Sequence, residues 1–186
     1  MLCLRLTPLL VLVLVSLGAA FPQEGTLRKG CSLFKYKQVI FHEMKAVEKM
    51  QKEFRSIRRL DRTCNTRLLD RKWTSAHLSV PDRVLLVEAE LNFTIAMLQR
   101  PARPSFARTR QRPLAFLAQA REDLQGCVVP SHQPSEELRQ WLQNLQVAMQ
   151  TVTQVSRAGG CLEDYAIRHV FEVLGDLNCA ARQEKC

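Results

Sequence analysis

The segment from Asp82 to Gln99 most constrains the fold, because at helical spacing it is apolar on two sides. One face carries Val84, Val87, Leu91, Ile95 and Leu98, and Leu86, Ala89 and Phe93 lie roughly opposite. A helix with one apolar face can lie at the surface, but a helix with two must be covered from both sides. The sequence therefore predicts a helical bundle with this segment in its middle.

Four further segments carry one apolar stripe each at helical spacing, and no stretch alternates long enough to predict a sheet. The stripes are Val39, Val47, Met50, Phe54 and Ile57; Leu117, Ala120, Leu124 and Cys127; Leu138, Trp141, Leu142, Leu145, Met149 and Val152; and Leu162, Ala166, Val170, Val173 and Leu177. The first stripe predicts a helix of about five turns. With a short helix over 66–71, we expect an all-α, single-domain bundle of five or six helices.

Prolines and glycines mark the expected ends of these helices. Residues 79–82, Ser-Val-Pro-Asp, form a good helix start, with a capping side chain and an early proline. We expect the two-faced helix to end at Pro101, a basic linker over 100–113, and a new helix opening at Pro113. The glycine pair 159–160 is expected to separate the last two helices.

The first 20 residues have the order of a secretory signal peptide. Arg5 precedes an apolar run from Leu9 to Leu17, interrupted only by Ser16, and small residues 18–20 precede an expected cut at Phe21. A membrane anchor is the alternative, but the run is shorter than a spanning helix requires. We therefore expect residues 1–20 to be a leader and residues 21–186 to be a secreted domain that does not insert into membranes.

Loss of the leader removes Cys3 and leaves six cysteines: Cys31, Cys64, Cys127, Cys161, Cys179 and Cys186. An even number in an oxidising compartment predicts disulfides, for which fifteen pairings are open. Zinc binding is the alternative, but no CxxC pair occurs, and the four histidines are too scattered to suggest a ligand cluster. We expect neither a metal nor a cofactor.

The chain has 27 Lys and Arg against 18 Asp and Glu, a formal net charge of +9, or +8 without Arg5. This charge suits a heparan-type glycan, an acidic protein partner or simply a basic surface, and without a nucleic-acid motif we expect no nucleic-acid partner.

No GxSxG, HExxH, phosphate-binding glycine loop or EF-hand loop occurs. Glu88 and Glu90 point to different sides of one helix, so they make a poor pair of catalytic acid and base. We therefore expect no enzyme activity.

Two helices carry apolar side chains away from their core stripes. In the closing helix, Ile167 and Phe171 lie roughly 80° and 120° from the stripe centre, among Asp164, Arg168 and Glu172. In the first helix, Phe41 and Met44 lie off the stripe, near Lys45, Lys52 and Arg55, whereas Glu43 falls inside the stripe without an evident reason. Exposed apolar side chains among charges are typical of a partner-binding patch, although a loop that covers Phe171 is an equal alternative.

Asn92 begins an Asn-Phe-Thr sequon for N-glycosylation. It falls on the narrow polar strip of the two-faced helix, beside Glu88. Many sequons on helices go unused, so the sequence leaves its occupancy open.

Four blocks, "VPDRVLLVEAELNFTIAML", "PLAFLAQAREDLQGC", "LRQWLQNLQ" and "GGCLEDYAIRHVFEVLGDL", together closely resemble the interferon lambda family, the type III interferons. The similarity covers nearly all of residues 21–186 in the same order, beginning at "GCSLFKYK". It implies a class II helical cytokine fold with six helices, A to F. It also implies three disulfides, namely Cys31–Cys127, Cys64–Cys161 and Cys179–Cys186.

The resemblance further implies an antiviral cytokine that binds a lambda-specific receptor chain and a second chain shared with the interleukin-10 group, and so activates JAK–STAT signalling. In the family, helix A, the A–B loop and helix F engage the lambda-specific chain, and parts of helices A and D meet the second chain. We expect a monomer whose receptor-binding set is Lys37, Phe41, Met44, Lys45, Trp73, Ile167, Arg168 and Phe171. The alternatives are another class II cytokine, of the interleukin-10 group or a type I interferon, and a cationic host-defence or glycan-binding protein.

Some positions match the family pattern and others depart from it. Phe171 matches the second aromatic residue of helix F, Trp73 a tryptophan after the A–B cysteine, and Lys37 and Glu43 positions around the start of helix A. Arg168 stands where mammalian members carry an aromatic residue, and residues 62–63, Arg-Thr, replace a tryptophan before the same cysteine. These departures put recognition of a mammalian receptor in doubt, and the composition suggests a non-mammalian vertebrate member.

Overall fold

The computed structural model describes residues 31–38, 41–57, 64–154, 156–183 and 186. Within these ranges the chain forms five α-helices and three short 3-10 turns and contains no strand, so the all-α prediction is confirmed. The elements are η1 (Phe34–Tyr36), α1 (Phe41–Ile57), η2 (Arg67–Leu69), η3 (Ser75–His77), α2 (Val80–Leu98), α3 (Pro104–Gln125), α4 (Glu136–Gln154) and α5 (Ser156–Arg182). The described part does not reach six α-helices: the short helix expected over 66–71 is the 3-10 turn η2. The leader and Val39 lie outside the described residues.

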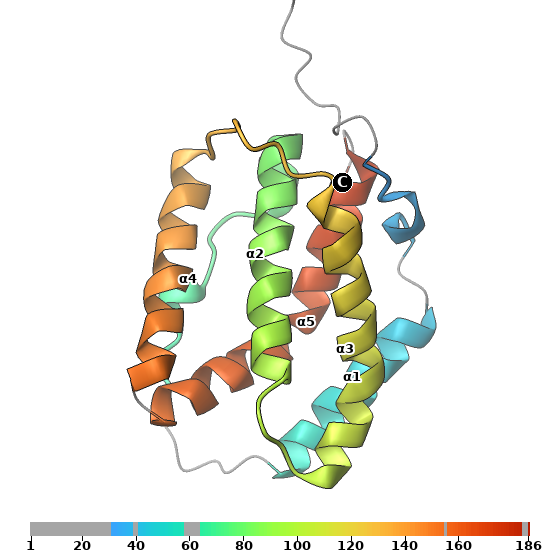
Figure 1. The fold of residues 1–186 in the computed structure, drawn as a ribbon, viewed down its shortest axis with the longest axis vertical. Coiled ribbons are helices and arrows are strands. Elements are labelled where there is room, and N and C mark those ends of the chain that lie inside the picture. Colours follow the sequence, from blue (N-terminus) through green and yellow to red (C-terminus); the bar gives the residue numbers. More distant parts are fainter. Residues whose placement is uncertain (1–30, 39–40, 58–63, 155, 184–185) are drawn as a thin grey trace, which may run out of the picture.

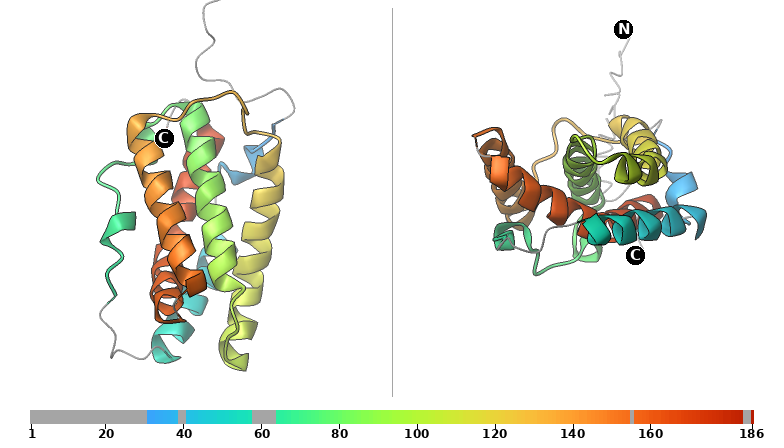
Figure 2. Two further views of the ribbon diagram at one scale, coloured as in Figure 1. Left: turned by 60° about the vertical axis from the view of Figure 1, so that its left-hand side comes forward. Right: turned by 90° about the horizontal axis from the view of Figure 1, so that it is seen from below.

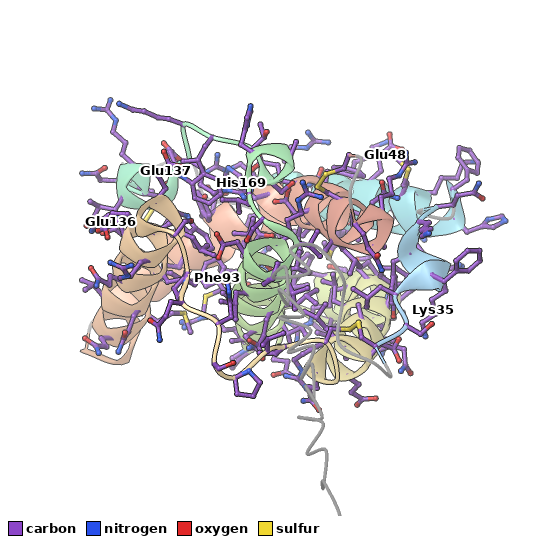
Figure 3. All side chains as sticks on the ribbon, turned by 90° about the horizontal axis from the view of Figure 1, so that it is seen from above. Lys35, Glu48, Phe93, Glu136, Glu137 and His169 are labelled. Carbon is purple, nitrogen blue, oxygen red and sulfur yellow. A yellow bond between two sulfur atoms is a disulfide. The ribbon has the colours of Figure 1, made fainter. Side chains whose placement is uncertain are left out.

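Helix α2 lies in the middle of the bundle, between α3 and α4, with α5 behind it (Figure 1). Its first predicted face packs in a core cluster with α1, α3 and α5, and its second face packs in another cluster with α4, η2 and the first half of α5. Phe93, on the second face, lies in the interior between α2 and α4, whereas Lys35 lies at the outer edge of the molecule (Figure 3). The prediction of a helix covered from both sides is confirmed.

Helix α3 begins nine residues earlier than we expected, and the prediction of a linker over 100–113 is wrong. Arg103 precedes the helix, Pro104 occupies its first turn, and Pro113 lies inside it. Proline suits the first turn because the helix leaves that N–H unbonded. Phe106 is 1% exposed, and its ring packs 5.4 Å from that of Phe54. Burial of this ring against α1 holds the segment in the helix despite the second proline.

The glycine pair 159–160 does not separate α4 from α5, because both residues lie within α5. Helix α4 ends at Gln154 and α5 begins at Ser156, so the division comes a few residues earlier than predicted. Glycine costs a helix about 1 kcal/mol relative to alanine, which tertiary contacts readily offset. One such contact is the disulfide at Cys161.

Three disulfides tie the bundle together, and they are the same pairs that the family resemblance implies. Cys31 is bonded to Cys127 and Cys64 to Cys161, with Cα atoms 4.7 and 5.4 Å apart. The third bond joins Cys179 to Cys186 near the end of the chain. The second bond attaches the α1–α2 loop, described from residue 64 to residue 79, to the first third of α5.

Candidate functional site

Four large apolar side chains are exposed on the side of the molecule formed by η1, α1 and α5. Phe34 is 74% exposed, Phe41 62%, Met44 44% and Phe171 37%. A groove of about 410 Å³ runs between these elements, and its lining residues are Lys37, Gln38, Met44, Phe171, Leu174, Gly175, Asn178 and Arg182. We call this the first groove. Exposed apolar side chains around a depression are the features of a protein-binding surface.

The segment at η1 is held firmly against α5 and α3. Asn178 donates hydrogen bonds to the backbone oxygens of Tyr36 and Lys37, at 3.0 and 2.6 Å. The buried Tyr36 hydroxyl donates to Asp123 at 2.5 Å, and burial together with this carboxylate raises the pKa of Tyr36. Burial favours neutral Asp123, but hydrogen bonds from Lys35 and Tyr36 outweigh it and lower the pKa of Asp123. These contacts fix Lys37 and Gln38 at the rim of the first groove.

Ile167 does not belong to this surface, and the expectation that it lies outside the core is wrong. It is 1% exposed and packs in the first core cluster. Gln51 of α1 donates to the backbone oxygens of Ile167 and Arg168, at 2.8 and 3.2 Å, so α1 covers this face of α5. Asp164 is buried as well, and accepts a hydrogen bond from Arg168 at 3.0 Å. Arg168 itself remains about half exposed.

Two of the exposed rings, those of Phe34 and Phe41, each lie beside a lysine ammonium. The Lys37 Nζ lies 5.1 Å from the centre of the Phe34 ring, and the Lys45 Nζ lies 4.4 Å from that of Phe41. Both distances are in the range of a cation–π interaction. This side of the molecule therefore offers apolar area and positive charge together, a combination that suits a partner with aromatic and acidic side chains.

Glu43, which the periodicity of the first helix left unexplained, forms an ion pair with Arg112 of α3. The Arg112 guanidinium donates from Nε and Nη2 to this carboxylate, with the shortest contact at 2.7 Å. The Glu43 side chain is only 14% exposed, whereas that of Arg112 is 58% exposed. The position of Glu43 on the apolar stripe is therefore explained by an arginine from the neighbouring helix, which the sequence of α1 alone does not indicate.

A second groove, of about 500 Å³, lies between the α1–α2 loop and α5. Its lining residues are Asp70, Arg71, Trp73, Thr74, Tyr165, His169, Glu172, Gly175 and Asp176. Gly175 lines the first groove too, so the two grooves meet on α5. Trp73 is partly buried against the second core cluster. The structure thus places Trp73 and Phe171 on either side of one helix position, as parts of one continuous surface.

The floor of the second groove contains a buried ionic cluster that the sequence reasoning missed. Arg71 contacts Asp176 at 2.6 Å and Glu90 at 3.1 Å, and the Ser75 hydroxyl donates to Asp176 at 2.6 Å. Burial, followed by the neighbouring Asp176, raises the pKa of Glu90 well above its ordinary value. Burial disfavours charged Arg71, but the two carboxylates outweigh it and raise the pKa of Arg71. One signal was available: a carboxylate in a helix apolar on two sides needs a buried partner.

Several hydrogen bonds hold the α1–α2 loop in place above this cluster. Trp141 and Tyr165 each donate to the backbone oxygen of Leu69, at 2.9 Å. The buried Arg83 donates to the backbone oxygens of Ser75, Ala76 and Leu78, at 3.0 Å each, and also to that of Gln183. The described part of the loop, residues 64–79, is therefore a fixed part of the surface.

The described residues contain no group of three or more His, Cys, Asp and Glu side chains that could hold a metal ion. Among the helices of the same ranges, none has the length and apolar character that a membrane crossing requires. Asn92 is exposed on α2, so the sequon remains a candidate for glycosylation.

Residues 28–183 match the family model described as Interleukin-28A. The chain is 51% identical to interferon lambda-3 of Gallus gallus over the full length of both proteins. It is 27% identical to interferon lambda-3 of Mus musculus, with 98% of each chain covered, and 27% identical to interferon lambda-1 of Homo sapiens, with 97% of this chain and 92% of the human one covered. These identities support an origin in a non-mammalian vertebrate. The chain therefore belongs to the interferon lambda family of type III interferons, and it is a cytokine, not an enzyme.

Proposed function

We propose that this interferon is secreted after loss of residues 1–20 and acts as a monomer that joins two receptor chains. One is the lambda-specific chain and the other is the chain shared with the interleukin-10 group, and their pairing activates JAK–STAT signalling and an antiviral state. The cytokine itself performs no chemistry. Because both chains must be held at once, the signal depends on two affinities.

The observation that carries this proposal is the exposure of Phe41, Met44 and Phe171 around the first groove. We assign the lambda-specific chain to the surface made by η1, α1, the α1–α2 loop and α5. Binding energy at such a surface is concentrated in a few central residues, and Phe171 lies where the two grooves approach each other. Of the expected receptor-binding set, Lys37, Phe41, Met44, Lys45, Trp73, Arg168 and Phe171 remain, whereas Ile167 supports α5 from inside the core.

The second receptor chain is assigned to the side where α1 and α3 lie together. These helices pack along each other through the rings of Phe54 and Phe106 and through the ion pair of Glu43 with Arg112. The two helices lie at the same side of the bundle, as the view from below in Figure 2 shows. This face shares α1 with the surface assigned to the lambda-specific chain but has α3 in place of α5, so the two chains would contact different sides of α1, as simultaneous binding requires.

Phe171→Ala tests the proposal most directly. We expect it to weaken binding to the lambda-specific ectodomain by about 2 kcal/mol or more, as loss of an interface anchor does. Its thermal unfolding should change little, because the side chain is already 37% exposed. Val147→Ala on α4, which removes a 54% exposed apolar side chain, is the matched control and should bind normally.

Surface plasmon resonance against the receptor ectodomains of the matching species provides the measurement, with a type I interferon receptor chain as reference. Binding only to the type I chain, or to neither chain, would contradict the proposed function. Unfolding of the Phe171→Ala protein would show instead that this ring supports the core.

A further inference from the structure

The connection from α2 to α3 and the first turns of α3 concentrate arginine. Arg100, Arg103, Arg108, Arg110 and Arg112 all fall between residues 100 and 112, and no Asp or Glu occurs from residue 91 to residue 121. This part of the chain lies at the end of the bundle opposite the connection from α3 to α4 (Figure 1). A surface with one sign of charge attracts polyanions, provided that the charges are not used internally.

The five arginines differ in how far the protein uses them. Arg110 is structural: its guanidinium donates to the backbone oxygen of Arg100 at 2.6 Å and lies 5.8 Å from the centre of the Phe106 ring. Arg112 is paired with Glu43 but remains 58% exposed. Arg103 and Arg108 are exposed, and neither guanidinium forms a hydrogen bond or ion pair with any described residue. At least two guanidinium groups are thus available to a ligand.

Two of the exposed arginines lie on one side of α3. Arg108 and Arg112 are four residues apart, so they lie on the same face about one turn from each other. Arg103 comes immediately before Pro104, the first residue of the helix. Glu43 lies beside Arg112, and Glu163 lies near Arg100 and Arg110. Five arginines against two carboxylates leave the cluster positive, with its three exposed members at the start and in the first turns of α3.

The surroundings of these arginines favour a sulfated sugar over other polyanions. None of the exposed large apolar side chains in the described residues lies on α3, so nothing there would enter a lipid bilayer. Phe106, the aromatic residue of the first turn, is buried and offers no ring for a base to stack on. Guanidinium groups match the oxygens of sulfate with paired hydrogen bonds.

We propose that Arg103, Arg108 and Arg112 bind a sulfated glycosaminoglycan chain at the start and first turns of α3. The choice of an extracellular polyanion rests on the proposed secretion, whereas the site itself does not depend on receptor binding. Binding there would hold the cytokine near cell surfaces without occupying the two grooves.

The test uses immobilised heparin and the secreted protein. Arg103→Gln with Arg108→Gln removes two charges from the arginine cluster. Arg67→Gln with Lys72→Gln removes two exposed charges from the α1–α2 loop and leaves the net charge the same as in the first variant. We expect the first pair of substitutions to weaken heparin binding at least about tenfold at physiological salt. It should also make the fall of log affinity with log salt less steep, by about two units of slope, whereas the second pair should change little.

Heparin stripped of its sulfates, phosphatidylserine vesicles and single-stranded DNA complete the comparison. Equal weakening of heparin binding in both double variants would overturn the site, and so would a failure of the unaltered protein to bind heparin. The site would also be overturned if the unaltered protein bound desulfated heparin as tightly as heparin, or bound vesicles or DNA more tightly than heparin. Circular dichroism confirms that both variants fold. The first variant should keep its affinity for the lambda-specific chain. If neither the unaltered protein nor any variant binds the lambda-specific chain, but heparin binding still needs Arg103 and Arg108, the receptor proposal fails and the glycan site stands.

Discussion

At the scale of single residues, the buried cluster around Arg71 shows how the α1–α2 loop is joined to two helices. One guanidinium faces Glu90 of α2 and Asp176 of α5, and burial makes two full negative charges beside one positive charge unfavourable. The raised pKa of Glu90 is the result. Because this carboxyl resists ionisation only in the folded protein, stability depends on pH through it.

Glu90→Gln is expected to change that dependence. As pH rises above the ordinary Glu value of 4.5, unfolded Glu90 releases its proton freely while folded Glu90 retains it. The unfolding free energy of the unaltered protein should therefore fall relative to that of the variant, by up to about 1.4 kcal/mol per pH unit. Urea unfolding from pH 4.5 to neutrality measures the difference, with exposed Glu137→Gln as the control. A difference that is constant or moves the other way would contradict the cluster.

At the scale of elements, periodicity predicted α2 and its two faces because both are properties of one segment. It placed Ile167 wrongly because a single helical wheel does not show that α1 covers a second side of α5. It began α3 too late because the burial of Phe106 depends on Phe54, far away in the sequence. The partners of Glu90 were missed for the same reason, since Arg71 and Asp176 come from other elements.

Helix α5 offers a test that separates stability from binding. A Cβ atom added at Gly175 would meet no atom within 4 Å, and this glycine lines both grooves. Gly175→Gln should therefore raise the unfolding free energy by up to about 1 kcal/mol, because glycine is a poor helix former. The same side chain should obstruct the surface and reduce affinity for the lambda-specific chain, which calorimetry and surface plasmon resonance measure on one sample. A stabilised variant with full affinity would exclude Gly175 from the interface.

At the scale of the whole molecule, the disulfides differ in what they connect. Cys64–Cys161 joins the α1–α2 loop to α5 across 97 residues, whereas Cys179–Cys186 closes a separation of only 7 residues. In the loop-entropy model, the longer closure stabilises more, by about 4.7 against about 2.5 kcal/mol. The longer one anchors the α1–α2 loop, whose residues Asp70, Arg71, Trp73 and Thr74 line the second groove.

Replacement of Cys64 and Cys161 by serine should therefore lower both stability and affinity for the lambda-specific chain. Replacement of Cys179 and Cys186 is the control, and should cost less stability and leave more of the affinity. Melting temperature and binding below the melting transition distinguish the two effects. Equal affinity losses in the two serine pairs would show that the loop does not need this bond to hold Trp73 in place.

The two-sided burial of α2 also has a consequence for hydrogen exchange. Each of its faces belongs to a different core cluster, so a local opening that frees α4 leaves the first cluster intact, and one that frees α1 leaves the second. Neither opening exposes the backbone amides of α2, which should exchange only when the whole molecule unfolds. The amides of α4 should exchange faster, through the local opening that frees α4 alone. The slowest amides of this cytokine are then those of α2, and their exchange rate reports its global stability.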